Sequence, residues 1–242
     1  MEYAEFVDHV RADGVLLADT ADGNIDADVP SCPDWQVRDL VAHVAQVYEH
    51  KIECTRLGRV PDPWPPEWAQ ANEPVPWFRD AHARLLEMFE HNDATSPSAT
   101  WWPADQTVGF WARRMAQETA VHRVDAELAR RAPTPVDAAL ATDGVDEVLH
   151  LMLAGDWSDD TDDAMTGQRI AIDTGGRTWQ VVLDREAVTV TDGDGQGNAR
   201  VSGAPSDVLL WMWGRATESD VEVSGDPEAP RLMRLRLLKA TQ

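Results

Sequence analysis

The segment "RRMAQETAVHRVDAE" (residues 113–127) decides which fold we expect for the N-terminal half of the chain. Its apolar spacing predicts a helix over about 108–131. Residues three and four apart share one face of such a helix, and one face carries Trp111, Met115, Glu118, His122 and Asp125. The two apolar members indicate that this face is buried, where a carboxylate is costly unless it is paired or binds a metal. Glu118 and His122, at positions i and i+4, therefore either grip one metal ion or hydrogen bond to each other.

A second segment, "CPDWQVRDLVAHV" (residues 32–44), offers a partner for this pair. We expect a helix that begins near Pro33 and Asp34 and stops at Gly58. His43 lies on its apolar face, where it is either a satisfied core residue or a third ligand. Two imidazoles and one carboxylate from two packed helices suit Zn²⁺ or another divalent metal, with a fourth position open.

A competing pair lies on the same helix as His43. His50 and Cys54 follow it at i+7 and i+11, so they form an i, i+4 pair of their own. This alternative has no third ligand that the sequence identifies.

The bulk composition limits the class of protein. The chain has 242 residues, of which 43% are hydrophobic and 26% are charged, and its formal net charge is −22. Such a charge repels phosphate backbones, so we expect no nucleic-acid partner. Apolar runs are too short to span a bilayer, and two cysteines without a C-x-x-C pair favour a reducing, cytoplasmic location. The preference for arginine over lysine, with many alanines and aspartates, indicates a GC-rich genome.

The pattern changes along the chain from helical to mixed. Helices are predicted over 3–19 and 77–91 in addition to the two above, and a proline-rich connection covers 60–76. After a helix near 137–154, the segment 168–184 alternates around Gly175 and Gly176 as a hairpin does. Strands at 186–192, 199–203 and 221–225 and helices at 205–216 and 227–240 complete the expectation. We therefore predict an α+β protein with a helical metal-binding domain over 1–140 and a small α+β domain over 141–242.

The two helical segments together resemble the mycothiol-dependent maleylpyruvate isomerase family. The runs "VRDLVAH" and "ETAVHRVDAE" carry the resemblance, and the tail that contains "PSDVLLWMWGRA" is also similar. The resemblance implies a DinB-like four-helix bundle at the N-terminus. It also implies a metal bound by His43, Glu118 and His122, and mycothiol, the small thiol of actinobacteria, as cofactor. Gln117 departs from relatives that carry His before the Glu.

The resemblance implies a zinc- and thiol-dependent reaction on a small electrophilic acid. A metal-bound thiol is deprotonated near neutral pH and adds to a conjugated enoyl acid, whose new single bond rotates before the thiol leaves. Isomerisation and S-transfer are both consistent with this chemistry. A thiol-independent zinc hydrolase and a non-catalytic metal-stabilised binding or stress protein are the alternatives.

One arginine in the C-terminal half is a candidate for catalysis and for cofactor binding. A chain of charge −22 needs a fixed cation to hold a carboxylate, and the guanidinium of arginine grips one bidentately. Arg215 follows Gly214 in "WMWGRA", and the family resemblance implies that the C-terminal domain closes over the metal. Arg114 and Arg38 are alternatives for this role. Arg215 could also be purely structural, because an arginine near a helix end interacts favourably with the helix dipole.

Overall fold

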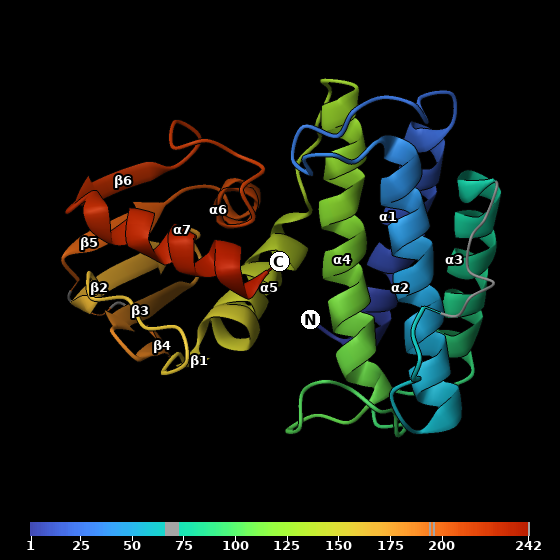
Figure 1. The fold of residues 1–242 in the computed structure, drawn as a ribbon, viewed down its shortest axis with the longest axis horizontal. Coiled ribbons are helices and arrows are strands. Elements are labelled where there is room, and N and C mark those ends of the chain that lie inside the picture. The colour runs from blue at the N-terminus through green and yellow to red at the C-terminus, as the bar shows by residue number, and fades with distance from the viewer. Residues whose placement is uncertain (66–72, 194, 196, 242) are drawn as a thin grey trace. The chain divides into compact units, whose positions relative to one another are not determined.

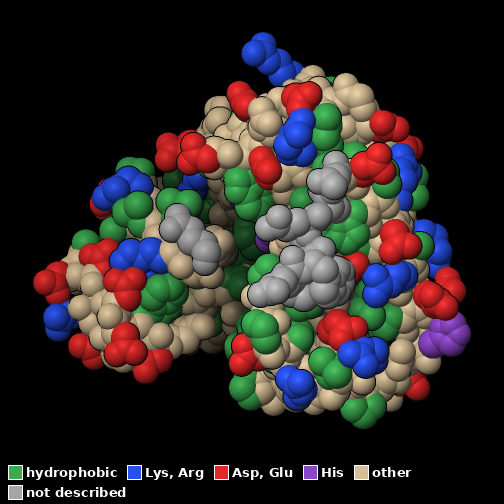
Figure 2. Space-filling view, turned by 45° about the vertical axis from the view of Figure 1, so that its right-hand side comes forward, with side chains coloured by type: hydrophobic (Ala, Val, Ile, Leu, Met, Phe, Trp, Pro, Cys, Tyr) green, Lys and Arg blue, Asp and Glu red, His purple; other side chains and the backbone are tan. Residues whose placement is uncertain are grey.

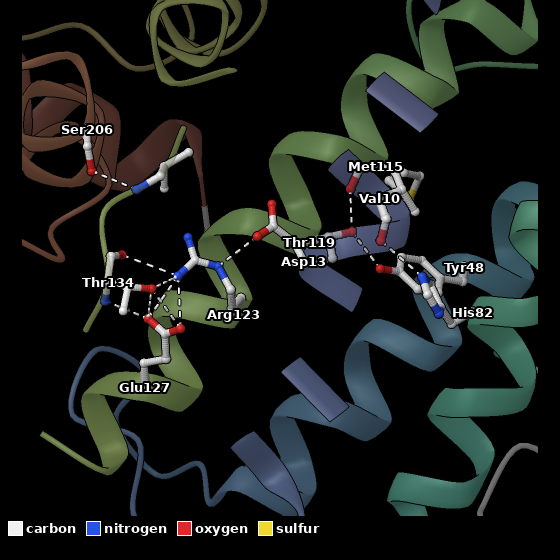
Figure 3. A network of polar contacts seen from close by, with 11 residues as sticks. Val10, Asp13, Tyr48, His82, Met115, Thr119, Arg123, Glu127, Thr134 and Ser206 are labelled. Atoms are coloured by element: carbon white, nitrogen blue, oxygen red, sulfur yellow. Dashed lines mark hydrogen bonds and ion pairs between the residues drawn. The ribbon is translucent and has the colours of Figure 1, made fainter. Parts of the chain in front are cut away.

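The computed structural model describes residues 1–65, 73–193, 195 and 197–241 (Figure 1). The chain divides into two compact units, Met1–Thr134 and Pro135–Gln242. This division lies six residues before the boundary expected from the sequence. Hydrogen bonds on either side of it give the reason. The backbone N–H of Thr134 donates to Glu127 at 2.7 Å within the first unit, whereas that of Val136 donates to Ser206 Oγ at 3.0 Å within the second (Figure 3).

In the described part of the first unit, four helices pack on one another. They are α1 (Tyr3–Ala21), α2 (Val37–Leu57), α3 (Pro74–Glu90) and α4 (Val108–Ala129). Helix α1 packs on α4 and α3, and α2 packs on α3 and α4. Apolar side chains from all four fill the interior, among them Val10, Leu17, Leu40, Val44, Phe78, Leu85, Trp111 and Met115. Burial of this apolar surface is the main driving force for the packing.

Helix α2 begins later than its sequence indicates. The expected start near Pro33 and Asp34 is wrong, because Asp34 has a left-handed φ of 71° and lies in a loop. The helix begins after Gln36, whose backbone N–H donates to Asp39 at 2.9 Å as one half of a capping box. Its end agrees with the expectation, since Gly58 adopts φ 63° as the left-handed C-cap.

The other predicted helices of this unit are present with shifted ends. Helix α4 stops at Ala129 because Arg131 turns to φ 58°, two residues before the predicted end. Helix α3 begins at Pro74, where the missing N–H of proline is tolerated in the first turn. The predicted proline-rich connection over 60–76 is described only in part, because residues 66–72 lie outside the described residues.

The second unit is built around one sheet. In the described part of the chain it contains β1 (Gly155–Asp156), β2 (Thr166–Asp173), β3 (Thr178–Asp184), β4 (Ala187–Asp192), β5 (Ala199–Ser202) and β6 (Glu222–Gly225). Their order is β1-β4-β3-β2-β5-β6. Only the pair β2/β5 among these neighbours is parallel. The predicted hairpin is present as β2 and β3, with Gly175 at φ 81° in its turn.

Helices accompany this sheet. They are α5 (Ala138–Glu147), α6 (Pro205–Met212) and α7 (Glu228–Ala240), and α7 packs on β2 and β5. The single helix expected over 137–154 is interrupted, because residues Val148–Leu153 form a π-helix after α5. Alternate side chains of β3, namely Trp179, Val181 and Leu183, are buried, as the period of a strand requires.

The described residues contain both helices and strands, so the chain is an α+β protein, as the sequence predicts. None of the helices in the described ranges combines the length and the apolar character that a membrane span needs. The surface in Figure 2 carries acidic and basic side chains in mixture rather than in separate fields.

Candidate metal centre

Three side chains from two helices converge between α2 and α4. His43 of α2 and Glu118 and His122 of α4 each offer one ligand atom, and these atoms all lie within 4.8 Å of one another. His43 Nε2 is 3.4 Å from Glu118 Oε1, and His122 Nε2 is 3.3 Å from the same oxygen. The structure thus brings together the three residues that the sequence singles out.

Glu118 is nearly buried and surrounded by positive charge. Its Oε1 faces both imidazoles, and its Oε2 accepts a hydrogen bond from Arg114, one turn earlier on α4. Burial works to raise the pKa of this carboxyl, but the charges of Arg114 and His122 outweigh it and hold the pKa well below its usual range. Glu118 is therefore ionised, as a metal ligand must be.

His122 is held in position by a second carboxylate. Its Nδ1 is 2.9 Å from Asp125 Oδ2, and because a carboxylate only accepts, Nδ1 carries the proton and donates it. Its Nε2 therefore faces Glu118. Burial works to lower the pKa of His122, but Glu118 and Asp125 raise it to about 9. A divalent cation would replace this proton at Nε2 and take over the same electrostatic role.

Asp125 is fully buried and receives further hydrogen bonds from a loop far away in the chain. Ser31 donates its hydroxyl to Asp125 Oδ1, and Cys32 Sγ lies 3.8 Å from Oδ2. The sequence places Asp125 on the same helix face as His122 but does not reveal the two loop residues. No local pattern signals them, since 94 residues separate Ser31 from Asp125.

His43 is the most exposed of the three ligands. Its side chain is 38% exposed, against 12% for Glu118, so a small molecule can approach the site from the side of α2. The centres of the Trp35 and His43 rings lie 5.0 Å apart, so the indole packs against this imidazole. Asp39, one turn before His43 on α2, accepts from the backbone N–H of Gln36 in the capping box.

The competing pair is also formed, but without a third ligand among the described residues. Cys54 Sγ lies 3.5 Å from His50 Nδ1. Burial raises the pKa of the Cys54 thiol, which disfavours the thiolate that metals bind. Groups of three ligands in the described ranges do not include either residue.

Another cluster of three ligand atoms lies in the second unit. Asp146, His150 and Asp192 come within 4.8 Å of one another. Arg177 Nη2 already lies 2.7 Å from one carboxylate oxygen of each aspartate, and Trp179 Nε1 donates to Asp146 at 3.0 Å. The guanidinium supplies the positive charge there, so we interpret this cluster as an ion-pair network.

Arg215 lies in the second unit, whereas the three candidate ligands lie in the first. Its Nη1 donates to the Trp213 carbonyl at 2.7 Å, and its guanidinium is 5.9 Å from the centre of the Trp213 ring. Gly214 adopts φ 76°, which glycine takes without strain. A role for Arg215 at the metal centre stays a prediction. Gln117, the departure from the family pattern, is buried with 1% exposure.

Comparison with known proteins gives this geometry a context. Residues 9–127 match the family model described as the mycothiol maleylpyruvate isomerase N-terminal domain. In structure the chain is similar to the mycothiol-dependent maleylpyruvate isomerase, with a TM-score of 0.61 and 14% identity over 93% of this chain and 95% of that one. A histidine-to-alanine mutant of that isomerase aligns over the same shares with a TM-score of 0.58 and 14% identity. None of the curated proteins matches the sequence.

The likeness to the solved structures is one of fold, and the matched N-terminal region contains all three converging residues. Residues 9–127 thus carry the N-terminal domain of the mycothiol maleylpyruvate isomerase family.

Proposed function

We propose that His43, Glu118 and His122 bind one divalent metal ion, Zn²⁺ by preference, at the centre of a DinB-like helical bundle. The donor set supports this assignment, because two imidazole nitrogens and one carboxylate oxygen with an open fourth position are typical of catalytic zinc sites. The close approach of the three ligand atoms is the observation that carries the proposal. Asp125 fits as well, since ligating histidines commonly donate their other N–H to a carboxylate.

We further propose that the protein is a mycothiol-dependent isomerase or S-transferase that acts on a small electrophilic enoyl or keto acid. When bound, the metal would supply stabilisation of a thiolate at neutral pH. In this proposal Glu118 and His122 fix the position of the nucleophile, and Asp125 holds the imidazole of His122 in the correct tautomer. The exposed side of His43 admits the thiol and the acid. The match of residues 9–127 to the family model supports the choice of mycothiol as the thiol.

Two other functions use the same centre. A zinc hydrolase would activate water at the open position and would need no thiol. A non-catalytic protein would use the metal for folding stability alone. Neither has an observation of its own in its favour, whereas the family match favours the thiol-dependent reaction.

Metal analysis tests the first half of the proposal. Purified protein should carry about one zinc per chain, as a three-ligand catalytic site does. The variant with alanine at His43, Glu118 and His122 should lose it, while the matched variant with alanine at His50 and Cys54 should keep it. Full metal content in the first variant, or loss of metal in the second, would overturn the assignment.

An activity assay tests the second half. Turnover of a cis-enoyl keto acid is measured with mycothiol, with a simple thiol and in thiol-free buffer. We expect turnover only with thiol, and we expect Cys32→Ser and Cys54→Ser to leave it in place because the thiol comes from outside the chain. Full activity in thiol-free buffer would favour the hydrolase, and no activity with full metal content would favour the non-catalytic protein.

A further inference from the structure

Lys51 is one of few lysines in this chain, and it lies on the same helix as the candidate ligand His43. The sequence has 21 basic residues, of which Lys51 and Lys239 are the lysines. Lys51 lies on α2, eight residues after His43, which corresponds to about 12 Å along the helix axis. It is only partly exposed, and its Nζ lies 4.7 Å from the centre of the Trp111 ring on α4. The ammonium group thus contacts both helices that carry the candidate metal ligands.

The ammonium group of Lys51 lacks a carboxylate partner in the described ranges of the chain. Its hydrogen-bonding neighbour is His50 Nδ1, at 3.2 Å. Burial and the charge of Lys51 together lower the pKa of His50 to about 4, so this imidazole is neutral and accepts the hydrogen bond. Burial likewise lowers the pKa of Lys51, and the charge of Glu118 opposes this only in part.

The carboxylate whose charge acts on Lys51 already has other partners. Both oxygens of Glu118 face other groups, with Oε1 toward His43 and His122 and Oε2 toward Arg114. Lys239 shows the contrast, because its Nζ donates to both oxygens of Asp160 at 2.7 and 2.8 Å on the surface. A half-buried cation that has no counter-ion among the described residues is costly, so its place on a helix of the candidate site indicates that an anion arrives from outside.

We propose that Lys51, above the face of Trp111, binds a carboxylate of the small acidic substrate while the reacting end of that substrate lies at the metal ligands. The inference rests on the proposed function and adds the residue that binds the carboxylate of the substrate. The buried Trp111 ring holds the Lys51 ammonium in place for an incoming carboxylate. Arg114 pairs with Glu118, so this carboxylate does not compete with the substrate for Lys51.

The scarcity of lysine allows a direct test. Reductive methylation with ¹³C-formaldehyde labels Lys51, Lys239 and the N-terminal amine, whose signals are assigned with Lys51→Arg and Lys239→Arg variants. Titration with maleate, a small dicarboxylate, should shift the Lys51 signal and raise its apparent pKa, because a bound carboxylate stabilises the ammonium form. The Lys239 signal should stay in place. Dimethyl maleate, which has no charge, should leave both signals unchanged.

Calorimetry on variants supplies the second readout. Lys51→Met should weaken maleate binding at least tenfold, a loss of about 1.4 kcal/mol. Lys51→Arg, which keeps the charge, should bind within threefold of the wild type, and the matched control Lys239→Met should bind as the wild type does. An unmoved Lys51 signal at saturating maleate, or wild-type affinity in Lys51→Met, would overturn the proposal.

The design separates this inference from the proposed function. Zinc content is measured in every variant, and Lys51→Met should keep its metal, because Lys51 is not one of the ligands. Maleate is titrated into both the zinc-loaded and the metal-free protein. A chain that holds no zinc refutes the proposed function, yet a shift of the Lys51 signal in that protein would still support the anion site.

Discussion

His122 Nδ1 donates a hydrogen bond of 2.9 Å to Asp125 Oδ2, three residues later on α4. This contact fixes the imidazole so that Nε2, and not Nδ1, faces Glu118 and His43. Asp125 is itself fixed by Ser31 and is completely buried. The orientation of the candidate centre thus depends on a residue that does not touch the space between the three ligands.

Replacement of Asp125 by asparagine should weaken metal binding without removing a ligand. The amide oxygen can still accept from His122, but the negative charge that supports the imidazole is lost. We expect the affinity for zinc to fall about 10- to 100-fold, as found when such orienting groups are removed. Competition with a chromogenic chelator measures the affinity. Asp39→Asn in the α2 capping box is the control, and equal affinities in wild type and Asp125→Asn would contradict the role assigned here.

Substitution of Arg215 should separate a role in the site from a role in the fold. If Arg215 holds the carboxylate of substrate or cofactor, Arg215→Ala and Arg215→Lys should keep the metal and the melting temperature. Their kcat/KM should drop at least tenfold, which corresponds to about 1.4 kcal/mol of transition-state binding. Turnover that is unchanged, or that falls only in proportion to the melting temperature, would leave Arg215 as a structural residue.

Gly14→Ala should destabilise the protein although alanine is the better helix former. A Cβ at Gly14 of α1 would lie 2.3 Å from His82 Nε2. The His82 ring cannot yield easily, because it is buried, stacks on Phe78 at 5.9 Å and bonds to the Val10 carbonyl at 2.9 Å. We expect a loss of about 1–3 kcal/mol in the free energy of unfolding, typical of an overpacked core.

Urea titration measures this loss, and a double-mutant cycle identifies its cause. If the His82 ring is what the new methyl group meets, Gly14→Ala should cost less in a His82→Ala background. The same cost in both backgrounds would point to the helix and not to the ring.

His82 should make the first unit sensitive to acid. Burial lowers its pKa, and the charge of Arg11 adds to this, while the hydrogen bond to the Val10 carbonyl works in the opposite direction. The folded pKa lies below the unfolded value of about 6.5, so the unfolded chain binds more protons in the interval between the two. The contribution of neutral His82 to the free energy of unfolding is therefore fully present above about pH 6.5 and is lost as the pH falls toward the folded pKa.

Free energies of unfolding between pH 7 and pH 4 check this direction. His82→Gln, which can still donate to Val10, should lose less stability over this range than the wild type does. The exposed His91 provides the matched control, and His91→Gln should follow the wild type. Parallel curves for His82→Gln and the wild type would show that His82 is not the acid-sensitive group.

The sequence by itself determined the local part of this protein. Helical spacing predicted α4 and put Glu118, His122 and Asp125 on one face, because residues three and four apart are neighbours on any α-helix. Alternation around Gly175 likewise predicted the β2–β3 hairpin, because its two strands lie next to each other in the chain. The triad that includes His43 followed from two such helices and from the assumption that their apolar faces meet.

Only the tertiary structure decided the long-range contacts. The link between Ser31 and Asp125, the division of Glu118 between two imidazoles and Arg114, and the enclosure of Lys51 by Trp111 depend on how α2 and α4 pack. Local sequence signals also gave wrong helix ends where the backbone formed other hydrogen bonds than expected. The capping box of Gln36 started α2 late, and a π-helix replaced the end of the predicted helix over 137–154. Spacing within one element is encoded by backbone geometry, whereas contacts between elements are fixed by burial and charge pairing that no single segment contains.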